Sequence, residues 1–155
     1  MKMENQDSLN KFGNTLLSPH MEDYLETIGI LSQKNNHVRV KDIADEMNIK
    51  MPSVTAALQK LNEMALVNYE KYKHVELTEE GKKLAGQIYM RHQCLTQFFQ
   101  DVLHLNNEDA ETEACKVEHV LQPETCERIS TFINFYEEKK HNNEEWIKEW
   151  ENKIS

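Results

Sequence analysis

The chain has 155 residues, of which 39% are hydrophobic and 29% charged, with only four Gly and three Pro. This composition excludes a collagen-like chain, argues against a β-sandwich and is typical of a helix-rich protein. The formal net charge of −9 is unevenly distributed, because residues 37–91 hold nine Lys or Arg against eight Asp or Glu, whereas residues 92–155 hold six against fourteen. A near-neutral first part can still gather its cations on one face, so the acidic balance does not exclude DNA as a partner.

The sequence also predicts the compartment. No stretch approaches eighteen apolar residues, and the first residues are polar and include Glu4 and Asp7, so we expect neither a membrane span nor a signal peptide. The three cysteines, Cys94, Cys115 and Cys126, lack CxxC spacing and are expected to stay reduced. We therefore predict a cytoplasmic protein with no membrane partner.

Periodicity predicts the elements of the first half. Residues 1–17 show no period and are interpreted as a flexible N-terminal arm, and Ser18-Pro19 is a typical helix start. Apolar residues then recur at helical spacing as far as Leu31. After it the pattern predicts an extended segment at 37–40, helices at 41–47 and 51–64 joined by a three-residue turn, and two strands at 66–70 and 74–78.

The second half is predicted to be helical throughout. Thr78-Glu79-Glu80 caps a long helix from about residue 79 to residue 102, and further helices follow at 108–121, at 123–138 and from about 143. We therefore predict a mostly α fold with a winged helix-turn-helix at residues 18–82 and an all-helical domain at residues 83–155.

The helix-turn-helix and hairpin predict a DNA-binding function, because the second helix of such a pair enters the major groove. Hydroxyl and ammonium groups at its start can contact phosphates or base edges, and apolar groups there can meet thymine methyls. The predicted DNA-contacting residues are Arg39, Lys50, Met51, Pro52, Ser53, Thr55, Lys60, Lys71 and Lys73. The alternative is that these are solvated side chains of an ordinary three-helix domain.

A second group of residues has the spacing of metal ligands. Cys115, Glu118 and His119 stand at i, i+3 and i+4, which puts a thiolate, a carboxylate and an imidazole on one helical face. The first helix adds two carboxylates three residues apart and the long helix adds an imidazole, namely Asp23, Glu26 and His92. The alternative is structural, because acidic residues favour a helix N-terminus and a cysteine often serves as a small buried side chain.

Several motifs together resemble the diphtheria toxin repressor family, and within it the short manganese transport regulators. The similarity runs from about Ser18 to Glu138. The motifs are MEDYLETI at 21–28, DIA at 42–44, PSVT at 52–55, LTEEG at 77–81, RH at 91–92 and EACKVEHV at 113–120. Singly none of these is specific, but together they are.

The resemblance implies a winged-helix domain followed by a helical dimerisation and metal-binding domain. It implies a homodimer on double-stranded operator DNA that represses metal-uptake genes, and no enzymatic activity or organic substrate. Carried over position by position, the implied ligands are Asp23, Glu26, His92, Cys115, Glu118 and His119. Asp23 matches the manganese-type pattern and Cys115 the iron-type pattern, so the effector is Mn²⁺ or Fe²⁺, with one or two ions bound. The larger iron-type members carry an SH3-like domain, for which this chain is too short.

The expected mechanism is a metal clamp, in which ligands from both domains are tied together by one dication. Two other functions remain open at this stage. The first is a winged-helix regulator that responds to an organic ligand or to oxidation of Cys94 or Cys115. The second is a metalloenzyme or metal buffer that uses the Cys/Glu/His cluster, although no substrate-binding motif is present.

Overall fold

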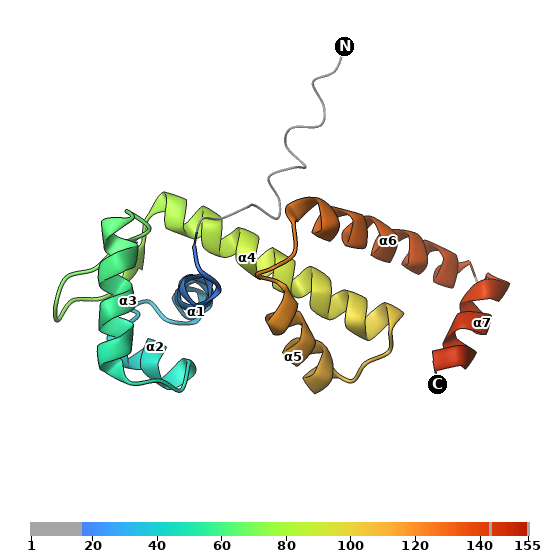
Figure 1. Ribbon diagram of the computed structural model, residues 1–155, viewed down its shortest axis with the longest axis horizontal. Helices are drawn as coiled ribbons and strands as arrows, with labels where there is room; N and C mark the ends of the chain where they lie inside the picture. Colours follow the sequence, from blue (N-terminus) through green and yellow to red (C-terminus); the bar gives the residue numbers. More distant parts are fainter. Residues whose placement is uncertain (1–16, 143, 155) are drawn as a thin grey trace, which may run out of the picture. The chain divides into compact units, whose positions relative to one another are not determined.

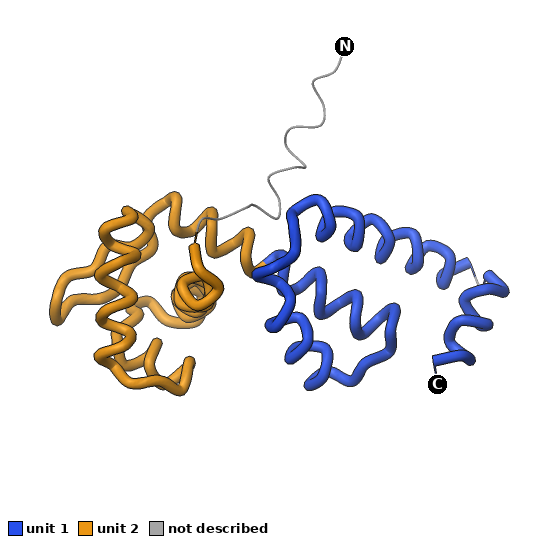
Figure 2. The backbone as a smooth tube through the Cα atoms, viewed as in Figure 1, with its two compact units in different colours: residues 1–14, 90–155 blue, residues 15–89 orange. Residues whose placement is uncertain are grey.

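The structure, a computed structural model, describes residues 17–142 and 144–154. The predicted N-terminal arm lies outside the described residues except for Leu17. The chain forms two compact units that divide between Tyr89 and Met90 (Figure 2). We call residues 17–89 the winged-helix unit and residues 90–154 the C-terminal unit. Among the described residues no helix is both long and apolar enough to cross a membrane.

The winged-helix unit contains the predicted helix-turn-helix followed by a hairpin (Figure 1). Its elements are α1 (Pro19–Lys34), α2 (Val40–Glu46), α3 (Met51–Glu63), β1 (Val67–Asn68), β2 (Glu76–Leu77) and the first part of α4 (Glu79–Gln97). The strands are antiparallel, with Val67 opposite Leu77. They are shorter than predicted, and a single bridge between Val38 and Val75 adds the predicted extended segment to their edge.

The core of this unit is built from the inner faces of its helices. Val54, Ala57, Leu58 and Leu61 of α3 are buried, and their spacing of three and four residues places them on one face of the helix. They join buried residues of α1, of α2 and of the first part of α4 in one cluster. This packing fixes the orientation of α3, so the opposite face of that helix is exposed to solvent.

The start of α4 depends on a close backbone approach. The amide of Gly81 donates to Thr78 Oγ1 at 3.0 Å, which confirms the predicted cap. The Thr78 hydroxyl also donates to the carbonyl of Ala65 at 2.7 Å. A Cβ on Gly81 would lie 1.9 Å from the Leu66 carbonyl oxygen, so only glycine allows the wing and α4 to meet here.

The C-terminal unit is all-helical, as predicted, but several helix boundaries differ. It holds the end of α4, the π-helix η2 (Phe98–Val102), α5 (Asn107–Val117), α6 (Pro123–His141) and α7 (Glu145–Ile154). The predicted α-helix to residue 102 instead widens after Gln97, where the Leu103 amide donates to the Phe98 carbonyl at 3.2 Å. The helix predicted to reach residue 121 ends at Val117, and residues 118–120 form a turn.

The π-helix is supported by a contact from the end of the chain. The indole Nε1 of Trp150 donates to the carbonyl of Val102 at 2.7 Å, which supplies a partner at a helix end. Around it, Cys94, Cys126, Ile133, Tyr136 and Ile147 form the buried core of this unit. The helix α7 is therefore an integral part of the C-terminal unit.

Candidate metal centre and nucleic-acid interface

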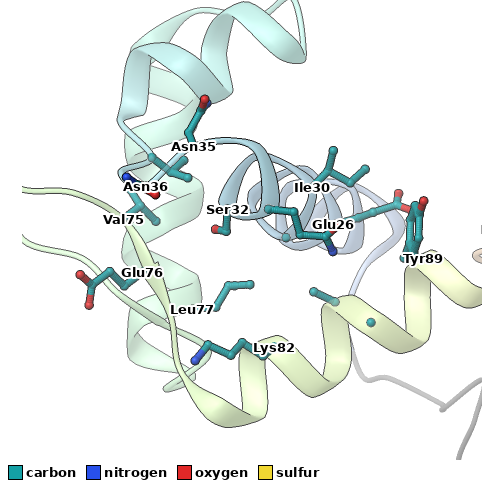
Figure 3. A pocket seen from close by; sticks show the side chains of 15 residues that line it. Glu26, Ile30, Ser32, Asn35, Asn36, Val75, Glu76, Leu77, Lys82 and Tyr89 are labelled. Carbon is teal, nitrogen blue, oxygen red and sulfur yellow. The ribbon is translucent and has the colours of Figure 1, made fainter.

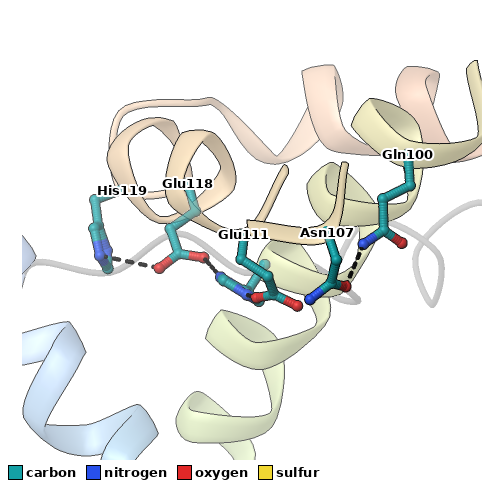
Figure 4. Close-up of polar contacts among 6 residues, drawn as sticks. Gln100, Asn107, Glu111, Glu118 and His119 are labelled. Atoms are coloured by element: carbon teal, nitrogen blue, oxygen red, sulfur yellow. Dashed lines mark hydrogen bonds and ion pairs between the residues drawn. The ribbon is translucent and has the colours of Figure 1, made fainter. Parts of the chain in front are cut away.

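The C-terminal unit places His92 of α4 between two carboxylates. Its Nδ1 lies 2.8 Å from Glu118 Oε2, and its Nε2 lies 2.7 Å from Glu111 Oε2 (Figure 4). Ionised carboxylates only accept hydrogen bonds, so both ring nitrogens of His92 must donate when both acids are charged.

Glu118 is the most buried member of the cluster, with none of its side chain exposed. Its Oε2 faces His92, and its Oε1 lies 3.2 Å from the Nε2 of His119 (Figure 4). Burial alone would raise the pKa of the Glu118 carboxyl, but hydrogen bonds and charge from His119 and His92 outweigh it and lower that pKa. The protein thus keeps a charged carboxylate buried between two imidazoles, which is a donor set that a divalent cation fits.

Cys115 lies at the surface beside this cluster. It lines a cavity of about 520 Å³ together with His92, Glu111 and Lys116. The predicted single helical face is therefore divided, because Cys115 belongs to α5, Glu118 is the C-cap of that helix, and His119 lies in the turn that follows. The thiol is exposed while the carboxylate is buried.

Glu111 was not predicted from the sequence. It stands four residues before Cys115 and seven before Glu118, spacings that place all three on one side of α5. This spacing was the only available signal, and acidic residues are frequent in that segment. The contact with His92 depends on how α4 and α5 pack, which no local pattern reveals.

The remaining two candidate ligands belong to α1 of the winged-helix unit. Asp23 Oδ2 lies 3.8 Å from His20 Nδ1, a weak and exposed ion pair. Glu26 lies on the wall of a cavity of about 480 Å³, where Gly29, Gly86 and Tyr89 also line the wall (Figure 3). Asp23 and Glu26 are one helical turn apart, so α1 offers two carboxylates on one side.

A second, larger cavity of the winged-helix unit, of about 1250 Å³, lies between α3 and the wing. Six of the nine predicted DNA-contacting residues line it, namely Arg39, Met51, Pro52, Thr55, Lys71 and Lys73. The other three are exposed but do not line it, namely Lys50, Ser53 and Lys60. Nine further lining residues were not predicted from the sequence, namely Val40, Lys41, Ala56, Gln59, Asn62, Glu63, Tyr69, Tyr72 and His74. A concave surface with this many cationic side chains is complementary to a nucleic-acid backbone.

Each of the two units is similar to a domain of a known protein family. Residues 16–75 match the iron dependent repressor N-terminal DNA binding domain, and residues 78–147 match the iron dependent repressor metal binding and dimerisation domain. An HTH-type transcriptional regulator of Methanocaldococcus jannaschii is 36% identical over 124 residues, which cover 79% of this chain and 99% of that protein. The HTH-type transcriptional regulator MntR of Geobacillus thermodenitrificans is 35% identical over 121 residues, which cover 78% of this chain and 85% of that protein.

Among solved structures, that of the manganese regulator SloR superposes with a TM-score of 0.67 at 30% sequence identity and covers 77% of this chain. The chain spans 55% of the length of SloR, so it matches only about half of that protein. These similarities confirm the family resemblance inferred from the sequence motifs and the mostly helical fold. The chain belongs to the iron dependent repressor family of transcriptional regulators.

Proposed function

We propose that the protein is a repressor that binds double-stranded operator DNA as a homodimer when Mn²⁺ or Fe²⁺ occupies its metal site, and thereby controls metal-uptake genes. The observation that carries this proposal is the buried Glu118 held between His92 and His119 in the unit that matches a metal-binding domain. A role on DNA would place the protein in the cytoplasm.

The proposed ligands follow from the donor atoms that each side chain offers to a metal ion. His92, Glu118 and His119 supply two nitrogens and a carboxylate oxygen, and Asp23 and Glu26 add oxygens that suit hard cations. Cys115 lies next to His92 and adds a sulfur donor that favours softer ions. A bound dication would supply positive charge that neutralises these carboxylates.

The same ligand set explains how metal would change DNA affinity. The α1 carboxylates and the His92–Glu118–His119 cluster belong to different units, so we propose that shared coordination ties the winged-helix unit to the C-terminal unit. Metal then increases affinity by preorganising the two α3 helices of a dimer. A coupling free energy of about 1–3 kcal/mol corresponds to about 5- to 150-fold tighter operator binding.

The proposed dimer contact is an aromatic band on α6 and α7, which we define as Phe132, Phe135 and Trp146. All three side chains are exposed, and the rings of Phe135 and Trp146 stack with centroids 6.2 Å apart. Exposed aromatic clusters are typical of interfaces between proteins. Phe135→Ser should shift the protein toward monomer in analytical ultracentrifugation, whereas Phe99→Ser, outside the band, should not.

The experiment that tests the proposed function is anaerobic fluorescence anisotropy. Duplexes enriched from a randomised 30-base-pair pool by the Mn²⁺-loaded protein serve as probes, and protein is titrated without metal and with Mn²⁺, Fe²⁺, Co²⁺ or Zn²⁺. We expect tight binding with Mn²⁺ or Fe²⁺ and weak binding without metal. Equal affinity with and without every metal would contradict the proposal. An affinity that changes only with oxidant would instead support the redox regulator.

A further inference from the structure

The winged-helix unit contains a second cavity, on the side where α1, β2 and α4 meet (Figure 3). We call it the α1–α4 cavity; its wall includes Glu26, Gly29, Leu77, Lys82, Gly86 and Tyr89. None of the nine predicted DNA-contacting residues lines it. Its volume of about 480 Å³ is typical of sites for small organic molecules. Part of its wall is apolar, because Val38, Val75 and Ala85 are buried there.

Gly86 leaves this cavity open without any packing reason. It lies in the interior of α4, where glycine is the least favourable residue after proline. A Cβ on Gly81 would lie 1.9 Å from the Leu66 carbonyl oxygen, and one on Gly29 would lie 3.1 Å from the Cβ of Ala85, so packing favours glycine at both positions. A Cβ on Gly86 would meet no atom within 4 Å outside its own helix backbone. The missing side chain therefore weakens the helix and preserves empty space.

Groups of opposite charge stand at the two ends of the cavity. Figure 3 shows Lys82 toward one end and Glu26 and Tyr89 toward the other, and one carboxylate oxygen of Glu26 is buried. Lys82 and Tyr89 are seven residues apart on α4, which corresponds to about 10 Å along the helix axis. The Lys82 ammonium lies 2.7 Å from Glu79, but such an exposed pair contributes little and another carboxylate can replace it.

These features describe the chemistry of a fitting molecule. It carries a carboxylate for Lys82, a hydroxyl that donates to Glu26, and a flat apolar body that packs on the apolar wall beside Gly86. A benzene ring with the two groups at opposite positions spans roughly this length when a hydrogen bond of about 2.8 Å is added at each end. A rigid ring also loses little conformational entropy on binding. We propose that the α1–α4 cavity binds a small hydroxyaryl carboxylic acid in this orientation.

The occupied cavity would oppose the metal, a step that rests on the proposed function. Glu26 is one of the proposed metal ligands, so the hydroxyl of the acid and the metal ion compete for one carboxylate. Because such coupling is reciprocal, the acid weakens metal binding by the same factor by which metal weakens binding of the acid. The acid therefore acts as an inducer, which releases the repressor from operator DNA when metal is limiting.

The first experiment titrates the metal-free full chain with 4-hydroxybenzoate in a calorimeter. Benzoate lacks the hydroxyl and 4-hydroxybenzyl alcohol lacks the carboxylate, so each analogue removes one of the two polar contacts. We expect a dissociation constant on the order of 0.1 mM for 4-hydroxybenzoate. Either analogue should bind about 10-fold more weakly or less, the scale of a lost hydrogen bond to a charged group. Equal affinity for all three compounds, or no binding of 4-hydroxybenzoate, would overturn the proposal.

The second experiment locates the site with Gly86→Met, which fills the open space with a flexible side chain and a better helix former. We expect this variant to melt higher than wild type, to lose binding of 4-hydroxybenzoate and to keep metal-dependent DNA binding. Lys82→Met should no longer distinguish the acid from the alcohol. Lys83→Met, which removes an exposed cation of α4 outside the cavity, should match wild type. A lower melting temperature of Gly86→Met, or unchanged affinity for the acid, would place the site elsewhere and overturn the proposal.

The third experiment measures Mn²⁺ affinity and binding to an enriched duplex with and without saturating 4-hydroxybenzoate. The acid should weaken Mn²⁺ binding at least 5-fold and release the duplex at limiting Mn²⁺, and benzoate at the same concentration should do neither. Unchanged Mn²⁺ affinity in the presence of the bound acid would overturn the competition for Glu26. Equal affinity for DNA with and without metal, when no acid is present, would instead overturn the proposed function, while the calorimetry would still decide whether the cavity binds the acid.

Discussion

Glu118→Gln is the most informative single substitution, because it keeps the shape of a fully buried side chain and removes its charge. In the wild type, this carboxylate faces ring nitrogens at 2.8 Å and 3.2 Å. A glutamine keeps one acceptor oxygen but replaces the other with a donor, and it offers a cation no negative charge. We expect the variant to fold and to lose most of its metal affinity.

The expected size of the effect follows from ligand linkage. At a metal concentration of about 100 Kd, binding stabilises the folded protein by about 2.7 kcal/mol. For a chain of 155 residues, 1 kcal/mol corresponds to a shift of about 2–4 °C, so the melting temperature should rise by about 5–11 °C. A 100-fold loss of affinity leaves about 0.4 kcal/mol, or about 1–2 °C, at the same metal concentration.

The assay is differential scanning fluorimetry with and without Mn²⁺, paired with anisotropy on an enriched duplex. Glu108→Gln is the matched control, since it removes an exposed carboxylate from the first turn of the same helix α5. We expect wild type and Glu108→Gln to show the full metal-induced shift and Glu118→Gln to show almost none. A full shift in Glu118→Gln would refute the assignment of Glu118 as a metal ligand.

Four further predictions test the core, the support of the π-helix and the thiol. Leu58→Ala, at a fully buried position of α3, should lower the free energy of unfolding by about 2–5 kcal/mol in chemical denaturation. Trp150→Phe removes the donor to the Val102 carbonyl and should cost about 1 kcal/mol in the same assay. In an alkylation experiment read by mass spectrometry, exposed Cys115 should react first, because Cys94 and Cys126 are buried and burial raises the pKa of the Cys126 thiol. Mn²⁺ or Fe²⁺ should slow the reaction of Cys115. Cys115→Glu should shift the preference in DNA-binding assays toward Mn²⁺ over softer ions, and an unchanged order of metals would remove Cys115 from the site.

The elements that could be predicted from sequence are those determined by neighbouring residues. The start of α1 at Pro19, the buried face of α3 and the cap at Thr78 each depend on residues a few positions apart. The π-helix could not be predicted, because its support comes from Trp150, 48 residues beyond the Val102 carbonyl that it contacts. The wing strands are shorter than their alternation suggested, because the turn closed by the Lys73 amide begins at Glu70 and Val75 pairs with Val38 instead of with the other wing strand.

The candidate metal cluster likewise contains residues that local spacing could identify and one residue that it could not. Glu118 and His119 could be singled out because the Cys-x-x-Glu-His spacing is local and rare. Glu111 was missed because its partner His92 lies 19 residues away on another helix. Which member is buried and which exposed also depends on packing, so the sequence could not separate the exposed thiol of Cys115 from the buried carboxylate of Glu118.

The arrangement around His92 bears on how the proposed metal site would respond to pH. Both ring nitrogens face carboxylate oxygens, at 2.8 Å and 2.7 Å, so a proton on Nδ1 of His92 can be donated to the buried carboxylate of Glu118 when no metal is bound. A ring nitrogen that coordinates a metal carries no proton, so protons compete with the metal for the ligand atoms of the cluster. Metal affinity should therefore fall as the pH is lowered. The coupling to DNA is limited by how much more tightly the metal binds the DNA-binding conformation than the other conformation.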